Sequence, residues 1–168
     1  IKYVLARVDT RLLHGQVATG WTHSTHPDRI IVVSDTVCHD KLRTNMIKQA
    51  APSGVQVHVI PIKNMVKANN DPRFGDTRAM LLFESVEDAL AAVKAGVDVK
   101  EINLGSSAYK EGKVNVTKAL SFDQTDVDAI KELQSLGVKF DVRGVPSDSP
   151  ANVDALIKSA ETKLAEKK

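Results

Sequence analysis

The alternation of continuous apolar runs with amphipathic stretches constrains the fold of this chain more than any other feature. RIIVVSD (29–35) and RAMLLFES (78–85) are apolar runs that end in polar residues, whereas SVEDALAAVKAG (85–96) has helical spacing. Strands that are apolar along their whole length are buried on both faces, as in parallel sheets covered by helices. The chain is therefore predicted to adopt an α/β fold with an open, mainly parallel β-sheet, helices on both faces and right-handed crossovers.

The same alternation extends along the whole chain. Strands are expected at 2–8, 29–35, 55–62, 78–85, 101–105 and 138–146, with a further extended stretch at 114–122. Helices are expected at 13–22, 40–51, 63–70, 85–96, 123–137 and 149–165. Ser85 and Gly96 are the predicted N-cap and C-terminal stop of the fourth helix. No linker, repeat or low-complexity segment interrupts the pattern, so residues 1–168 are expected to form a single domain.

The composition argues against several classes of protein. The net charge is +2 and aromatic residues make up 4%, which indicates neither nucleic acid nor a membrane surface as a partner. No window approaches the ~18–20 consecutive apolar residues that span a bilayer. The N-terminal IKYVLARVD meets charged residues too early for a signal peptide. Cys38 is the single cysteine, which fits a reducing cytosol, so a cytoplasmic protein is expected.

Ligands of open α/β sheets bind outside the carboxyl ends of the strands. The tips of the first, second and fifth predicted strands, with the residues that follow them, are therefore candidate sites, and Ser34, Asp35 and Ser106 lie at the last two. The segment after the first strand is the richest in candidate residues. These are Arg7, Asp9, Arg11, His14, Gly15 and Gln16.

A helix is expected to begin at this first segment, so its free backbone N–H groups and positive dipole end favour an anion, most naturally phosphate. Arg11 would add a planar charged donor, and Gly15 would let the backbone approach closely. The glycine-rich nucleotide motifs G-x-G-x-x-G and G-x-x-x-x-G-K-[ST] are both missing. What remains is a histidine beside an anion pocket, which can carry a phosphoryl group on nitrogen. From the residues alone, a packed or merely exposed His14 is the commoner alternative.

Two other groups of residues are candidate sites. His23 and His26, with His14, could suggest a metal site, but no carboxylate or thiol is near them in sequence, so a solvated helix end is expected. Cys38 beside His39 could be a reactive thiol, although a small buried residue beside a surface histidine is the simpler expectation. No metal and no cofactor are expected.

RVDTRLLHGQVATGW (7–21) resembles the signature of the IIB subunits in the mannose/fructose/sorbose family of the bacterial phosphoenolpyruvate-dependent sugar phosphotransferase system (PTS). The pattern of that family is roughly R-I-D-x-R-L-I-H-G-Q-V followed by a tryptophan, and this chain departs from it conservatively at Val8 and Leu13. INLGSS (102–107) and VKFDVRGVPSDSP (138–150) resemble later segments of the family. The resemblance thus covers nearly the whole chain.

The resemblance implies a phosphohistidine–sugar phosphotransferase in which His14 carries the phosphoryl group on Nδ1. It implies a IIA subunit as donor, and transfer to a sugar that enters through the IIC and IID membrane subunits, with which a cytoplasmic IIB subunit associates peripherally. Arg11 would stabilise the phosphoryl group, and the remaining phosphate-binding residues would be Arg7, Asp9, Gly15 and Gln16. The alternative is a regulatory or interaction module on the same fold. The sugar and any homo-oligomer stay undetermined.

Overall fold

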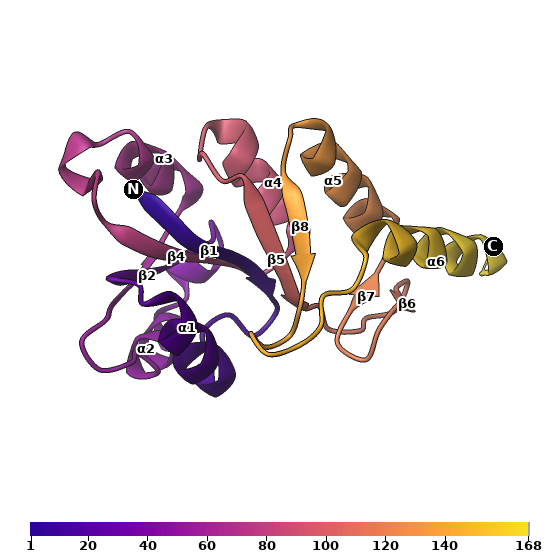
Figure 1. Ribbon diagram of the computed structural model, residues 1–168, viewed down its shortest axis with the longest axis horizontal. Coiled ribbons are helices and arrows are strands. Elements are labelled where there is room, and N and C mark those ends of the chain that lie inside the picture. Colours follow the sequence, from indigo (N-terminus) through magenta and orange to yellow (C-terminus); the bar gives the residue numbers. More distant parts are fainter. Residues whose placement is uncertain (168) are drawn as a thin grey trace.

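A computed structural model of the chain describes residues 1–167, and its centre is a six-stranded parallel β-sheet (Figure 1). The strands lie in the order β3-β2-β4-β1-β5-β8. Their bounds are β1 (Lys2–Asp9), β2 (Arg29–Val33), β3 (Gln56–Ile60), β4 (Arg78–Phe83), β5 (Glu101–Ser106) and β8 (Lys139–Val142). Each neighbouring pair is parallel, which confirms the predicted α/β fold.

Helices cover both faces of this sheet (Figure 1). One face carries the π-helical segment η1 (Val17–Trp21) with α1 (Thr22–Thr25), and α2 (Lys41–Gln49) preceded by the short η2 (Val37–His39). The other face carries α3 (Ile62–Asn69), α4 (Val86–Ala95), α5 (Gln124–Ser135) and α6 (Val153–Glu166). A further short turn of helix, η3 (Pro72–Phe74), precedes β4.

Strand β4 shows why apolar and polar residues do not alternate along the predicted strands. Met80 and Leu82 pack in the cluster under α1 and α2, whereas Leu81 and Phe83 pack in the cluster under α3 to α6. All four side chains are fully buried. A strand with a hydrophobic cluster on each side has no face left for polar residues.

The carboxyl end of β1 lies where the two layers of helices diverge. β1 is followed by helices on one face, and its neighbours β4 and β5 are followed by α4 and α5 on the other. Such a switch point leaves a crevice beyond the ends of the strands, which is where open α/β sheets bind ligands. In Figure 1 the arrowheads of β5 and β8 point towards this lower edge of the sheet.

The predicted signals at the ends of α4 are present in the structure. The hydroxyl of Ser85 accepts a hydrogen bond of 3.1 Å from the backbone N–H of Asp88. Gly96 ends the helix with a left-handed φ of 114°, a conformation that costs glycine little. Both residues therefore do what the sequence predicts of them.

Two predicted elements were wrong in detail. The first helix does not begin at Leu13, because Leu12 has a φ of 59° and the helical turns start only at residue 15. The stretch 114–122 is not one extended segment, because β6 (Val114–Asn115) and β7 (Ser121–Phe122) form an antiparallel hairpin. In the turn of this hairpin, the N–H of Val116 donates to the carbonyl of Leu120 at 2.9 Å.

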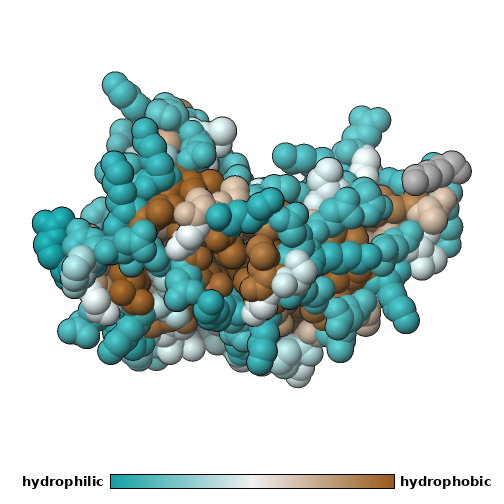
Figure 2. Space-filling model, turned by 90° about the horizontal axis from the view of Figure 1, so that it is seen from above, coloured by the Kyte–Doolittle hydropathy of each residue, from teal (hydrophilic) through white to brown (hydrophobic). Residues whose placement is uncertain are grey.

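Hydrophobic residues reach the surface on one face of the molecule. Figure 2, which views the molecule from above relative to Figure 1, shows them along the middle of this face with hydrophilic residues around them. Within residues 1–167 no helix has the length and apolar character needed to cross a membrane.

We predict that Leu81→Ala lowers the free energy of unfolding by about 2–5 kcal/mol, because it leaves a cavity under a fully buried side chain. Chemical denaturation measures the effect. Leu136→Ala is the matched control, since that leucine is 50% exposed and such surface changes stay within about 0.5 kcal/mol. Equal losses in the two variants would contradict the assignment of the core.

Candidate active site

The backbone after β1 turns sharply and brings His14 to the start of a helix. The N–H of Leu12 donates to the carbonyl of Asp9 at 2.9 Å, which closes the turn. The side chains of Leu12 and Leu13 are buried in the cluster under α1 and α2. The carbonyl of His14 then accepts from the N–H of Ala18 at 2.8 Å, the first hydrogen bond of the helical segment. His14 is therefore fixed by the backbone on both sides.

The ring of His14 forms a hydrogen bond with a buried carboxylate. Its Nε2 lies 3.0 Å from Oδ2 of Asp9, and 19% of the His14 side chain is exposed while Asp9 is fully buried. Burial alone would raise the pKa of Asp9, but hydrogen bonds from His14 and from the backbone of Arg11, with the charge of Arg7, hold that pKa below its usual range.

An ionised carboxylate only accepts hydrogen bonds, so the ring nitrogen facing Asp9 carries the proton. The proton is therefore on Nε2 of His14, and in the neutral ring the lone pair is on Nδ1. The hydrogen bond to Asp9 is the one that the ring makes within residues 1–167. The site thus presents one defined nucleophilic nitrogen.

Arg11 shares the same carboxylate from the solvent side. Its backbone N–H donates to Oδ1 of Asp9 at 2.9 Å, and its Nε lies 3.4 Å from that oxygen. Its side chain is 55% exposed. Arg11 and His14 are therefore held on the two oxygens of one carboxylate, and the guanidinium of Arg11 has surface left for an anion.

Arg7 differs from the sequence expectation, which placed it among residues that touch phosphate. Its side chain is fully buried, and its Nε and Nη2 donate to Oδ2 of Asp9 at 3.3 and 3.0 Å. Its Nη1 donates to Oδ1 of Asn103 at 2.7 Å and to the carbonyl of Arg143 at 3.3 Å. Because both Arg7 and Asp9 lie below the surface, they support the ring of His14 and offer no exposed face to an anion.

Gly15 and Gln16 lie at the surface. A Cβ atom at Gly15 would meet no other atom within 4 Å, so the space over this residue is open. Both residues belong to the first helical turn after His14, where backbone N–H groups lack partners within the helix.

The polar residues at the ends of the other strands accept hydrogen bonds from backbone N–H groups. The hydroxyl of Ser34 accepts from the N–H of Val37 at 3.0 Å. The carboxylate of Asp35 accepts from the N–H of Ile62 at 2.8 Å, and the carbonyl of Ser106 accepts from the N–H of Thr10 at 3.2 Å. These three residues hold neighbouring segments in place.

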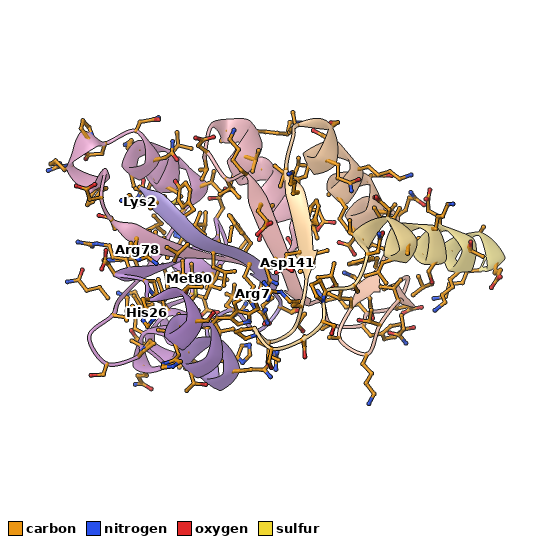
Figure 3. All side chains as sticks on the ribbon, viewed as in Figure 1. Lys2, Arg7, His26, Arg78, Met80 and Asp141 are labelled. Atoms are coloured by element: carbon orange, nitrogen blue, oxygen red, sulfur yellow. The ribbon has the colours of Figure 1, made fainter. Side chains whose placement is uncertain are left out.

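Several polar residues behind the site are not predicted from the sequence. Asn103, Asp141 and Arg143 form a hydrogen-bonded group that reaches Arg7, and Figure 3 shows Arg7 and Asp141 close together at the lower ends of their strands. Trp21 is buried, and its indole N–H donates to the carbonyl of Gly144 at 3.0 Å. The only signal in the sequence was that these residues fall within segments resembling the family.

The candidate metal ligands His23 and His26 lie at the end of α1. His23 and His26 are exposed, with ring centroids 6.0 Å apart. Within residues 1–167, the cluster with metal-like spacing consists of Glu87, Asp123 and Asp126. The ammonium group of Lys113 already lies 2.9 Å from Asp126, and the carboxylates of Asp123 and Asp126 cap the start of α5. This acidic cluster is therefore accounted for by a lysine and a helix end.

This chain is similar in sequence to one family of known proteins. A family model described as "PTS system sorbose subfamily IIB component" matches residues 3–168. The sorbose-specific EIIB component of Lacticaseibacillus casei is 39% identical over 153 residues, which cover 91% of this chain and 93% of that protein. The mannose-specific EIIAB component of Escherichia coli (strain K12) is 42% identical over 91% of this chain, but the match covers 47% of that protein. The chain thus spans about half the length of the EIIAB relatives that it matches.

The solved structures agree with the sequence relatives. The IIBSor domain of the sorbose permease from Klebsiella pneumoniae superposes with a TM-score of 0.91 at 38% identity. The match covers 95% of this chain and 98% of that chain. The similarity therefore includes the sheet and both layers of helices.

We predict that Gly105→Ala disrupts the support of the site, because a Cβ atom at Gly105 would overlap the guanidinium of Arg7. Such overpacking typically costs about 1–3 kcal/mol of folding stability, measured by chemical denaturation. Gly15→Ala is the matched control, since its Cβ would enter open space. A Gly105→Ala protein as stable as the control would show that Arg7 is free to move.

Proposed function

This chain belongs to the sorbose subfamily of PTS IIB components, and on that premise we propose that it is a phosphocarrier with the phosphoryl group on Nδ1 of His14. The observation that carries the proposal is the hydrogen bond between Nε2 of His14 and the buried carboxylate of Asp9. It leaves Nδ1 as the nucleophile. The membership supports a phosphotransferase, and the geometry favours this atom.

The first step is a transfer between two histidines. Nδ1 of His14 attacks the phosphorus of a phosphohistidine on a IIA unit, and the bond from phosphorus to the donor nitrogen breaks with its electron pair returning to the donor ring. The ring of His14 gains positive charge as the new bond forms. Asp9 stabilises that charge through Nε2–H, much as a buried aspartate orients a catalytic histidine in hydrolases.

The second step hands the phosphoryl group to a sugar. A sugar hydroxyl attacks phosphorus, the bond to Nδ1 breaks with its electron pair returning to the ring of His14, and the hydroxyl proton is released. Throughout, the exposed guanidinium of Arg11 and the backbone at Gly15 and Gln16 offset the negative charge of the phosphoryl oxygens. Arg7 and Asp9 contribute by holding the ring. No nucleotide or metal enters either step.

The proposed partners follow from the names of the relatives. The E. coli relative is an EIIAB component, and the match to about half of it fits a IIB unit that works with a IIA unit. We propose that residues 1–168 form one IIB domain, that it is cytoplasmic, and that it associates with the membrane surface through IIC and IID subunits. Relatives are named for mannose, sorbose, fructose and N-acetylgalactosamine, so a hexose or amino sugar is the proposed acceptor class.

We predict that His14→Ala abolishes acid-labile phosphorylation when phosphoenolpyruvate and the upstream proteins are supplied. Radiolabelled phosphoenolpyruvate and gel autoradiography measure the label. His23→Ala is the control and keeps the label, because His23 is an exposed histidine on the following helix. Label retained in His14→Ala would overturn the assignment. Wild-type protein that labels at His14 but phosphorylates no sugar with matching membranes would favour the regulatory alternative.

We predict that Arg11→Ala slows phosphorylation of His14 roughly a hundredfold to a thousandfold, the range for loss of one preorganised charge-stabilising group. Its side chain is 55% exposed, so the free energy of unfolding should change by no more than about 0.5 kcal/mol. Rapid-quench labelling and chemical denaturation measure the two quantities. Arg11→Lys, which keeps the charge, should lose less of the rate. A large loss of stability in Arg11→Ala would instead mean that the arginine is structural.

A further inference from the structure

We propose that Asn103 is a positioning residue for His14, although it lies two hydrogen-bonded side chains away from the ring. This inference rests on the proposed function, in which Nδ1 of His14 must be free and correctly oriented. It concerns a row of buried polar residues that crosses three strands behind the site.

The row is a product of strand register. Arg7 on β1 is paired with Asn103 on β5, and Asn103 is paired with Asp141 on β8. Residues paired in this way point to the same face of a parallel sheet. On that face the apolar pattern of the strands is interrupted by three polar side chains in a line.

Hydrogen bonds join the members of the row to His14. The amide nitrogen Nδ2 of Asn103 donates to Oδ2 of Asp141 at 2.9 Å and to the carbonyl of Arg143 at 3.1 Å. Its oxygen Oδ1 accepts from Nη1 of Arg7 at 2.7 Å. Nη2 of Arg7 then donates to Asp9 at 3.0 Å, and Oδ2 of Asp9 faces the ring of His14. Asn103 is therefore the one member with an acceptor towards the site and a donor away from it.

Because Asn103 is buried, the loss of its hydrogen bonds would be costly. Asn103 is 2% exposed, and Arg7 and Asp9 are fully buried, so lost hydrogen bonds cannot be replaced freely by water. Without Asn103, Nη1 of Arg7 keeps only the longer bond of 3.3 Å to the carbonyl of Arg143. The guanidinium of Arg7, which orients Oδ2 of Asp9, then has no short hydrogen bond on the side that faces away from Asp9.

The outer end of the row ties the helix after His14 to the same framework. The Nε of Arg143 donates to Asp141 at 2.9 Å, and its guanidinium lies 5.2 Å from the centre of the Trp21 ring. Trp21 lies in η1 and also donates to the carbonyl of Gly144. The ring of His14 and the helix that follows it are thus both fixed to the carboxyl ends of β5 and β8.

The position of Asp9 determines the tautomer of the His14 ring. While Asp9 is held against Nε2, the neutral ring of His14 keeps its proton there and leaves Nδ1 free. When Asp9 is released from its anchor, the proton can occupy either nitrogen, and the fraction of molecules with a free, aligned Nδ1 falls. Asn103 acts on the reaction through Arg7 and Asp9 without touching the phosphoryl group.

The test is the substitution Asn103→Ala in the otherwise native chain. Long-range ¹H–¹⁵N spectra of the unphosphorylated protein report the tautomer of His14, and rapid-quench labelling reports its phosphorylation rate. We expect the Nε2–H form in the native protein, a mixture of tautomers in Asn103→Ala, and a rate lower by about tenfold. Ser121→Ala is the matched control. It removes a similarly buried hydroxyl, 3% exposed, whose hydrogen bond of 2.6 Å to Asn115 lies outside the row.

A second pair of variants decides the matter if Asn103→Ala does not fold. Asp141→Ala removes the acceptor of Asn103 and should slow labelling about threefold, whereas Asp141→Asn keeps an oxygen there and should stay within about twofold of the native rate. A folded Asn103→Ala, or Asp141→Ala, with the native tautomer and rate would overturn the proposal. Because the tautomer is read without any phosphate, a native protein that is never labelled would count against the proposed function alone.

Discussion

The carboxylate of Asp9 is the interaction on which the rest of the site depends. It accepts hydrogen bonds from five donors, contributed by the side chains of Arg7 and His14 and by the backbone and side chain of Arg11. A fully buried carboxylate without such partners would be strongly unfavourable. The folded protein therefore has to bring these residues together, and the orientation of His14 is a consequence of satisfying Asp9.

The same reasoning explains why the site extends so far behind the surface. The guanidinium of Arg7 is buried and needs acceptors of its own, which Asn103 and the carbonyl of Arg143 supply. Gly105 leaves room for it, since any side chain there would overlap Arg7. Breaking a buried ion pair by removing one partner is much more costly than the pair is stabilising. Each buried side chain of the polar row therefore depends on its neighbour for a hydrogen-bond partner.

The sequence predicted the fold well because the dominant signal is local and strong. The apolar run of β4 reports burial on both faces, and Ser85 and Gly96 mark helix ends through their own side-chain and backbone chemistry. The sequence also predicted which loop holds the site, but it did not predict the hydrogen-bonded residues that support His14 from behind. Whether Arg7 faces solvent or Asn103 depends on strand order, and the pairing of β1 with β5 joins residues 96 positions apart. No pattern within one segment contains that information.

The left-handed backbone of Leu12 has a consequence for how the loop meets its substrate. A leucine with a φ of 59° is unfavourable by about 1–2 kcal/mol, which is similar to the gain of about 1.5–3 kcal/mol from burying its side chain. The loop is thus held in shape by the core and not by its own conformational preference. Because that shape is complete before any phosphate arrives, the incoming group meets a rigid, preorganised surface, and little of its binding energy is consumed in reorganising the loop.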